Sequence, residues 1–260
     1  MVEGQHHLAR RVADSPKPMA LLGGQPLLWH LMMWYSHWGH KEFILCLGHG
    51  GDVIRDWCRE NSSRQLAPRL SHPPEKCERF AFVGGDEGGW DVTLVETGLE
   101  TIVGQRLRKV RAFVDDEDVF LANYADGLSD VRLPELIDVA ATTLATATFL
   151  SVPLRTSLHA VSAQQSDGLV TGISPLADHG IRVNGGFFVL RREIFDVLQA
   201  GEELVAEPFQ RLIAQERLVA HRHDGFWVAL DTAKDRVFAD QLWQSGLRPW
   251  AVWQQAVPSV

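Results

Sequence analysis

The sequence predicts an α/β fold with a mostly parallel sheet that helices cover on both faces. Short apolar runs alternate along the chain with amphipathic segments of helical period, and turn residues separate them. No internal repeat or low-complexity segment interrupts this alternation. The 260 residues and a hydrophobic fraction of 45% suit one sizeable core, so we expect a single domain over residues 1–260.

The first half of the chain supplies several of these elements in order. Residues Gln25–Trp38 carry apolar side chains at helical spacing after the turn Gly23-Gly24, which predicts a helix. The stretch EFILCLGHGGDVIRDWCREN then predicts strand, turn and helix, half of a βαβ unit. Residues 61–90, rich in Pro, Gly, Ser and charge, are the expected excursion, and DVTLVETG is the next expected strand.

The second half continues the alternation. RKVRAFVDDEDVFLANYADG predicts a helix-like piece and then a strand that ends at Ala125-Asp126-Gly127. LPELIDVAATTLATATFLSV predicts helix then strand, and NGGFFVLRREIFDVL predicts strand then helix. HDGFWVALDTAKDRVFADQLW predicts a strand and a helix, and residues 240–260 are expected to form a C-terminal helix and the aromatic tail PWAVW. That tail indicates a buried contact, as between subunits.

Composition excludes several classes of function. The net charge is −8 and no run of Lys or Arg is longer than two, which argues against binding to nucleic acid or to an anionic membrane surface. No apolar run reaches the roughly 18 residues that span a bilayer, and MVEGQHHLARR lacks the apolar stretch of a signal peptide. Cys46, Cys58 and Cys77 form no close pair, so we expect reduced thiols and a cytoplasmic protein.

Two aspartates are candidates for a Mg²⁺ site. Asp126 and Asp231 each stand at or just beyond the carboxyl end of an expected strand, where ligands bind in parallel sheets. Mg²⁺ prefers one or two protein carboxylates together with phosphate oxygens. The alternative is structural, because Asp126 suits a turn and Asp231 suits a helix N-cap. They make a metal pair only if the fold brings them together.

Three further positions could contact a phosphate-bearing ligand. The prolines of PKPM hold the backbone of Lys17 extended, so its ammonium could project in a fixed direction; the alternative is a solvated loop lysine. Asn184 precedes Gly185-Gly186, where backbone could approach a ligand, or where the chain could simply bulge. Arg106 could pair with phosphate or with a surface carboxylate. The histidines at 6–7 and 221–223 do not match zinc spacing, and no G-x-S-x-G or Walker A pattern occurs.

The order of the motifs carries a family resemblance. PKPM, GG-x-P-x-LWH-x-M, LG-x-x-G-x-VI, VTLV-x-TG, Y-x-DG-x-SDV, NGGFFVL, EP-x-x-RL, HDGFW, DT and LW-x-SG-x-x-PW follow one another between roughly residue 8 and residue 253. Together they resemble glucose-1-phosphate cytidylyltransferase, of the sugar-nucleotide pyrophosphorylase superfamily. The combination is specific, although each motif alone is weak.

The resemblance implies a Rossmann-like nucleotidyltransferase fold and a reaction of CTP with glucose 1-phosphate that gives CDP-glucose and pyrophosphate. It also implies Mg²⁺ as cofactor and assembly into a homo-oligomer or with a partner subunit. By position, it makes Lys17 and Asp126 catalytic, Asp126 and Asp231 metal ligands, and Arg106, Asn184 and Gly185 substrate-binding residues.

The chain departs from the family at both substrate sites. The family's strand and G-G-x-G-T-R-L loop, which cradles the triphosphate, would fall on and before Val2–Leu8, where only the leucine matches. We therefore expect the first strand to be absent, and Glu3 to repel a triphosphate. His6 and His7 stand in place of the Thr-Arg pair, where they could donate to phosphate when protonated or remain mobile.

The second departure concerns the sugar phosphate. The family's Glu-Lys-Pro segment falls on Ile173-Ser174-Pro175, and no lysine occurs between Lys109 and Lys234. Smaller changes are Gln105 and Ala125 for glycines, and Ser157-Leu158 for Phe-Gly. Three hypotheses remain open: an enzyme with weak or altered turnover, a silent homologue that acts as partner or regulatory subunit, and a site reused for another sugar or nucleotide ligand.

Overall fold

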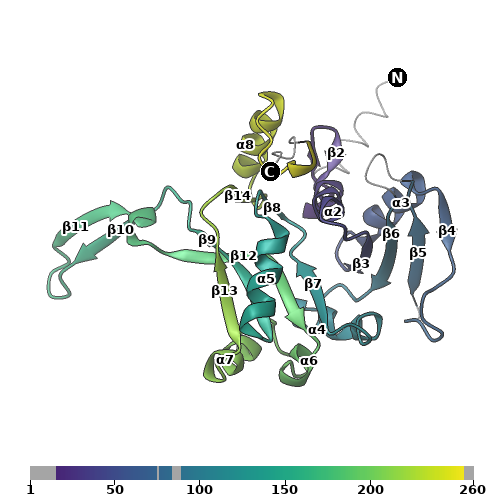
Figure 1. Cartoon of the computed structure of the whole chain (residues 1–260). Helices are drawn as coiled ribbons and strands as arrows, with labels where there is room; N and C mark the ends of the chain where they lie inside the picture. Colours follow the sequence, from purple (N-terminus) through teal and green to yellow (C-terminus); the bar gives the residue numbers. More distant parts are fainter. Residues whose placement is uncertain (1–15, 75, 84–88, 255–260) are drawn as a thin grey trace.

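The computed structural model describes residues 16–74, 76–83 and 89–254, which contain two four-stranded sheets (Figure 1). The first sheet has the order β3 (Glu42–Leu47), β6 (Asp91–Glu96), β5 (Cys77–Ala81) and β4 (Arg64–Leu66). The second has the order β13 (Leu218–Arg222), β9 (Ala147–Pro153), β12 (Arg182–Arg191) and β7 (Val119–Asn123). Helices lie between and beside these strands, so the predicted α/β class is confirmed.

The direction of the strands corrects one expectation. Among the described strands only β3 with β6 and β13 with β9 pair in parallel, so the expectation of a mostly parallel sheet is wrong. A parallel pair needs a crossover, such as helix α3 (Gly51–Asn61) between β3 and β6. The chain passes from β9 to β12 through a β-hairpin instead, without an α-helix, and these two strands pair antiparallel.

Most of the predicted helices are present, although the helix over 207–214 was not predicted and the helix over 103–109 begins before the expected helix-like piece. Helix α2 (Leu27–His37) lies inside the predicted range Gln25–Trp38, and α3 follows β3 as the βαβ half predicts. The other α-helices are α4 (Val103–Lys109), α5 (Leu133–Thr143), α6 (Ile194–Val197), α7 (Glu207–Ala214) and α8 (Ala233–Gln244). Short 3-10 turns are η1 (Lys17–Met19), η2 (Arg111–Phe113), η3 (Leu176–His179) and η4 (Val252–Gln254). Residues 61–90, the expected excursion, include β4 and β5 of the first sheet.

Helices α2 and α4 join the two sheets. The ring of Tyr35 in α2 packs edge-on against Phe43 of β3 and tilted against Phe187 of β12. Leu107 of α4 packs both beside Phe120 of β7 and beside the cluster around Val95 of β6. Both sheets therefore share these helices, and β3 and β7 are each an edge strand of its own sheet.

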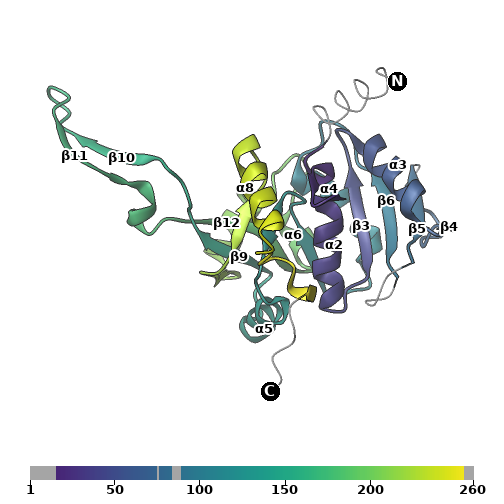
Figure 2. The ribbon, with the colours of Figure 1, turned by 90° about the horizontal axis from the view of Figure 1, so that it is seen from above.

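A hairpin of β10 (His159–Ala163) and β11 (Val170–Pro175) projects from the second sheet (Figures 1 and 2). Its central pair, Val161 and Ile173, is directly opposed in register, yet the two side chains are 59% and 68% exposed. The sequence did not predict this hairpin, because its strands pack against each other and not against the core.

The aromatic tail packs inside the same chain. Trp250 is 1% exposed and lies against Phe226, so this tryptophan does not supply a contact between subunits. Cys46, Cys58 and Cys77 form no disulfide. Within the part of the chain that the structure describes, no helix is long and apolar enough to cross a membrane.

Candidate active site

Two short strands bring the predicted metal ligands together. Strand β8 (Gly127–Ser129) follows Asp126, and β14 (Trp227–Ala229) precedes Asp231. The strands pair antiparallel, with Ala229 opposite Gly127, and the pairing continues as the Leu230 amide donates to the Asp126 carbonyl at 2.8 Å. Asp231 therefore lies beside Asp126, although the two are distant in the sequence.

Lys17 lies between the two carboxylates. Its Nζ donates to Asp231 Oδ1 at 2.5 Å and to Asp126 Oδ2 at 3.5 Å. The three side chains are 48%, 53% and 30% exposed for Lys17, Asp231 and Asp126, so a ligand could reach them. We call these three residues the Lys17 cluster. Its formal charge is −1, so the cluster can attract a further cation.

The protonation of the cluster follows from its contacts. The hydrogen bond from Lys17 to Asp231 is the main reason that the pKa of Lys17 lies above its usual range. Burial raises the pKa of Asp126, and the charge of Asp231 adds to this while Lys17 opposes it. A cation bound beside Asp126 would favour its ionised form.

The donor set fits Mg²⁺. Within the described residues no third carboxylate, histidine or cysteine completes a metal-binding group with the pair. Two carboxylates alone suit an ion that keeps water and phosphate oxygens in its coordination sphere, as Mg²⁺ does, and they do not suit a closed zinc site. Asp126 and Asp231 would hold the ion, and Lys17 would then be free to turn toward an anion.

Asn184 and Gly185 lie on β12, close to the start of β8. Asn184 Oδ1 accepts from the Gly186 amide at 2.9 Å, within an irregularity of β12. Gly185 has no side chain, and its carbonyl accepts a hydrogen bond from Trp227 Nε1 at 2.8 Å. A Cβ on Gly127, the residue after Asp126, would lie 3.8 Å from that carbonyl. The structure thus places both predicted residues beside the Asp126 loop, without a contact to Lys17.

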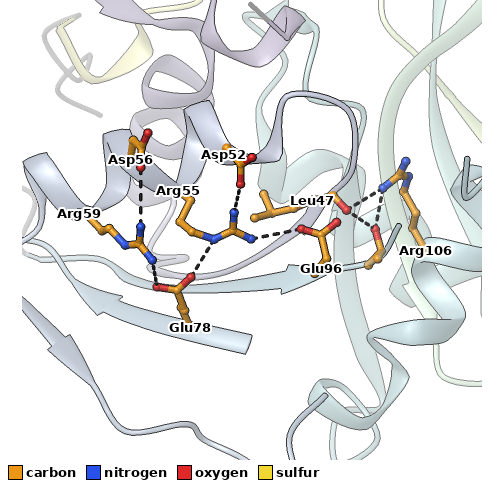
Figure 3. A network of polar contacts seen from close by, with 9 residues as sticks. Leu47, Asp52, Arg55, Asp56, Arg59, Glu78, Glu96 and Arg106 are labelled. Atoms are coloured by element: carbon orange, nitrogen blue, oxygen red, sulfur yellow. Dashed lines mark hydrogen bonds and ion pairs between the residues drawn. The ribbon is translucent and has the colours of Figure 1, made fainter. Parts of the chain in front are cut away.

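Arg106 is held elsewhere. Its Nη1 donates to the Leu47 carbonyl at 3.0 Å and to Thr97 Oγ1 at 2.6 Å, and its Nη2 donates to the Leu99 carbonyl at 3.3 Å. A Cβ on Gly48 would lie 2.3 Å from Nη2, so the guanidinium covers the turn after β3 (Figure 3). Its contacts within the described residues hold the ends of β3 and β6 together.

A second ionic group lies at the same edge of the first sheet (Figure 3). Arg55 of α3 pairs with Asp52, with Glu78 Oε1 at 2.8 Å and with Glu96 Oε2 at 3.2 Å. Arg59 extends the group by pairing with Glu78 Oε2 at 2.9 Å. We call these five residues the Arg55 cluster. The Arg55 side chain is only 14% exposed, so the cluster ties α3 to β5 and β6.

A cavity of about 730 Å³ opens at the carboxyl ends of β3 and β6. The residues that line it are Gly48, Gly50, Gly51, Asp52, Arg55, Arg59, Lys76, Cys77, Glu78, Glu96 and Leu99. The Lys17 cluster does not line this cavity, but Pro16 borders its rim, since a Cβ on Gly50 would lie 2.7 Å from Pro16 Cδ. The cavity therefore borders Pro16, the residue that precedes Lys17 and η1.

Three of the departures from the family motif lie apart from one another in the chain. Residues 2–8, including His6 and His7, lie outside the described residues, so the expectations about the loop and the first strand stay predictions. Ile173-Ser174-Pro175 lies in β11 of the projecting hairpin. Gln105 Nε2 donates to the carbonyls of Gln199 and Glu202 at 2.9 and 3.1 Å, so this side chain ties α4 to the loop before α7.

Sequence reasoning missed several residues around the site. Tyr124 lies between the Asp126 loop and β12: a Cβ on Gly186 would lie 2.9 Å from its ring, and burial, with the charges of Glu203 and Asp126, raises its pKa to about 12. Its place in the motif YADG could have drawn attention to it. The Arg55 cluster was not predicted, because Glu78 and Glu96 come from β5 and β6 and, of its carboxylates, only Asp52 lies on the same helix as Arg55.

Comparison with known proteins places the chain in a family. No family model matches it. It is 35% identical to glucose-1-phosphate cytidylyltransferase of Salmonella typhi over 250 residues, which cover 95% of each protein. It is 32% identical to the probable glucose-1-phosphate cytidylyltransferase of Bacillus subtilis over 242 residues, 92% of each.

Solved structures agree on the fold. UTP-bound UGPase from Acinetobacter baumannii has a TM-score of 0.61 at 14% identity, with 96% of this chain and 93% of that chain covered. HddC from Yersinia pseudotuberculosis has a TM-score of 0.59 at 14% identity, with 88% and 91% covered. These matches confirm the predicted nucleotidyltransferase fold. Taken with the identity to curated relatives along nearly the whole chain, they show that the chain belongs to the glucose-1-phosphate cytidylyltransferase family of nucleotidyltransferases.

Proposed function

We propose that the chain is a Mg²⁺-dependent sugar-1-phosphate nucleotidyltransferase whose turnover of CTP and glucose 1-phosphate is weak. One observation carries the proposal. Lys17 Nζ lies between Asp126 and Asp231, so the cation and both carboxylates that the family resemblance assigns to metal and phosphate meet at one point. An exposed lysine gains little stability from partly exposed carboxylates, so a role in binding explains its position better.

The reaction explains why these groups are needed. An oxygen of the sugar 1-phosphate attacks the α-phosphorus of the nucleotide, and pyrophosphate leaves as the new P–O bond forms. Mg²⁺, when bound, neutralises negative charge on the phosphate oxygens. Asp126 and Asp231 would hold the ion, and Lys17 would turn from Asp231 to donate to a phosphate oxygen. Positioning and electrostatic stabilisation supply most of the rate in such transfers.

The cavity beside the Arg55 cluster is the proposed place for the base and ribose. It lies at the carboxyl ends of the parallel strands β3 and β6, where α/β sheets bind ligands. Its rim reaches Pro16, so a nucleotide with its base in the cavity would extend its phosphates toward Lys17. The sugar 1-phosphate would then approach from the side of Asn184 and Gly185, next to the Asp126 loop.

Two features of the sequence support weak turnover. The sequence of Val2–Leu8 departs from the family's phosphate-binding loop and includes the acidic Glu3, and no lysine occurs between Lys109 and Lys234 to meet the sugar phosphate. Loss of one preorganised donor costs about 10²–10³ in rate. Because both substrates lose contacts, we propose turnover below roughly 1 s⁻¹, the low end of ordinary enzymes.

The test follows pyrophosphate release. The protein is incubated with Mg²⁺, glucose 1-phosphate and each nucleoside triphosphate in turn, beside Asp126→Asn. The expected result is slow release with CTP that requires Mg²⁺ and disappears in the variant. Fast release would contradict weak turnover.

Two other results would replace the proposal. No release and no thermal shift with any nucleotide would favour a silent homologue that acts as a partner subunit. A shift with a nucleotide that never turns over would favour a site reused for another ligand.

A further inference from the structure

Helix α8 carries Asp231 before its first turn and Trp243 in its last. Thr232 caps the helix, and Asp235 completes a capping box with it, so Asp231 is rigidly joined to the helix start. Only Ala239 of the 12 helix residues is buried. The helix is held at its capped start, and Leu242 and Trp243 pack against the core near its end.

The ring of Trp243 lies so close to Gly23 that a side chain would not fit at position 23. A Cβ on Gly23 would lie 1.9 Å from Trp243 Cε2, and Gly23 has a φ of +58°. Gly23 stands in the turn between β1 (Leu21–Leu22) and β2 (Gln25–Pro26). Lys17 opens η1, and a single residue, Ala20, separates η1 from β1. The same short stretch thus supplies both the lysine of the Lys17 cluster and the surface on which α8 rests.

Trp243 also packs against His30, and we call Gly23 and His30 together the seat of Trp243. His30 is 0% exposed, and its Nε2 donates to the Leu22 carbonyl at 2.9 Å. Its Nδ1 accepts from Trp250 Nε1 at 3.4 Å, so one neutral tautomer satisfies both contacts. The imidazole packs edge-on against Trp243 with ring centroids 5.3 Å apart. Arg248 stacks on Trp243 from another side, 3.8 Å from the ring centroid.

We propose that Trp243, seated on Gly23 and His30, is a positioning residue that sets the place of Asp231 relative to Lys17 and thereby the metal affinity of the Lys17 cluster. The inference rests on the proposed function, since it assigns the cluster to a metal. The backbone before Asp231 is held by the hydrogen bond of the Leu230 amide, so a displacement of Trp243 at the other end of this helix, about 18 Å long, would rotate the helix about its start and turn the Asp231 side chain.

The test measures Mn²⁺ binding to the full chain by electron paramagnetic resonance. Trp243→Leu should weaken binding about 10-fold, the lower range for residues that orient metal ligands. Trp253→Leu is the matched control, because Trp253 packs against Trp29 and His30 in the same aromatic group and is not part of α8. Trp243→Phe keeps a ring on the seat and should restore most of the affinity, and circular dichroism checks that each variant is folded.

A second measurement separates this inference from the proposed function. Labelling of the Lys17 amine by an amine-reactive reagent, compared with Lys41 by mass spectrometry, reports whether Asp231 still holds the lysine without any metal. Trp243→Leu should raise the rate for Lys17 several-fold, and Trp253→Leu should not. If Mn²⁺ does not bind the unmodified chain but this difference appears, the proposed function fails and the positioning role stands. Equal labelling in both variants, or equal Mn²⁺ affinity in both, would overturn the inference.

Discussion

The Lys17 cluster and the Arg55 cluster are built from the same kinds of group but differ in what holds them. Arg55 is 14% exposed, its partners Glu78 and Glu96 are 23% and 28% exposed, and all three come from one sheet and the helix that covers it. Lys17 is 48% exposed and joins two carboxylates from distant parts of the chain. Burial and multiple partners make the Arg55 cluster a structural tie.

The difference shows which ion pairs are candidates for function. An exposed lysine gains little stability from its partners, because solvent screens the attraction. Its place between two carboxylates is better explained by what they can bind together. The Arg55 cluster has more ion pairs, and we assign the metal to the sparser one. The following predictions test this difference between the two clusters, in order of decreasing expected effect.

Asp126→Asn should cause the largest loss. It removes one of two metal ligands, so Mg²⁺-dependent pyrophosphate release should fall by at least about 10². The midpoint of thermal unfolding should stay close to that of the unmodified chain, because the side chain is partly exposed. Asp115→Asn is the control: Asp115 is 45% exposed and pairs with Arg111 outside both clusters, and its loss should leave release unchanged. Equal losses in the two variants would break the contrast.

Acid unfolding should depend on His30, which belongs to neither cluster. Burial is the main cause that lowers the pKa of His30 from 6.5 to about 4, and Arg248 adds to the effect. Between these pH values the unfolded chain binds more protons than the folded chain, so stability falls as pH falls. The loss should reach about 3 kcal/mol at pH 4 relative to pH 6.5.

The measurement is urea unfolding across this pH range. His30→Gln keeps a donor and an acceptor but cannot take up the proton, so its stability should depend less on pH in this window. The same slope in both proteins would show that other groups, and not His30, cause acid unfolding.

Arg55→Met should affect folding and leave the metal site alone. It removes the cation that Asp52, Glu78 and Glu96 share. Glu78 keeps its pair with Arg59, whereas the partly buried Glu96 loses its ion pair. We expect a loss of about 2 kcal/mol, below the range for fully buried pairs. Urea unfolding measures the loss. Mn²⁺ affinity at the Lys17 cluster should not change, and a large change there would show that the two clusters are coupled.

Glu216→Gly provides a baseline outside both clusters. Glu216 follows the C-cap of α7 with a φ of +55°, which costs a side-chain-bearing residue about 1 kcal/mol. Relief of this strain should raise the midpoint of thermal unfolding by roughly 2–4 °C. Glu216→Ala keeps a Cβ and should give no gain. Equal midpoints in the two variants would show that the backbone strain at this turn is negligible.

The sequence predicted the elements well where local patterns decide them. The helix over Gln25–Trp38 and the strand in DVTLVETG have clear periodicity, and the structure has both, as α2 and β6. The pairing direction could not be predicted in this way, because it depends on whether a connection crosses the sheet. The hairpin β10–β11 was missed, since its small and polar residues give no alternating apolar pattern.

The candidate site was only partly predictable. Asp126, Asp231 and Lys17 were named from strand ends and from the motif PKPM, but their contact depends on the register of β8 and β14, which short strands do not encode. Arg106 was assigned to substrate binding, and its contacts in the structure are with backbone carbonyls and Thr97. The support of Asp231 by Trp243 needs the packing of α8 on a glycine turn, which sequence spacing does not reveal.

The most direct test of the central claim is a crystal structure of the chain with CTP and Mg²⁺. The account predicts a metal ion at about 2.1 Å from carboxylate oxygens of Asp126 and Asp231, with Lys17 Nζ moved from Asp231 to a phosphate oxygen. An ordered nucleotide with its metal held elsewhere, and with Lys17 still between the two carboxylates, would contradict it.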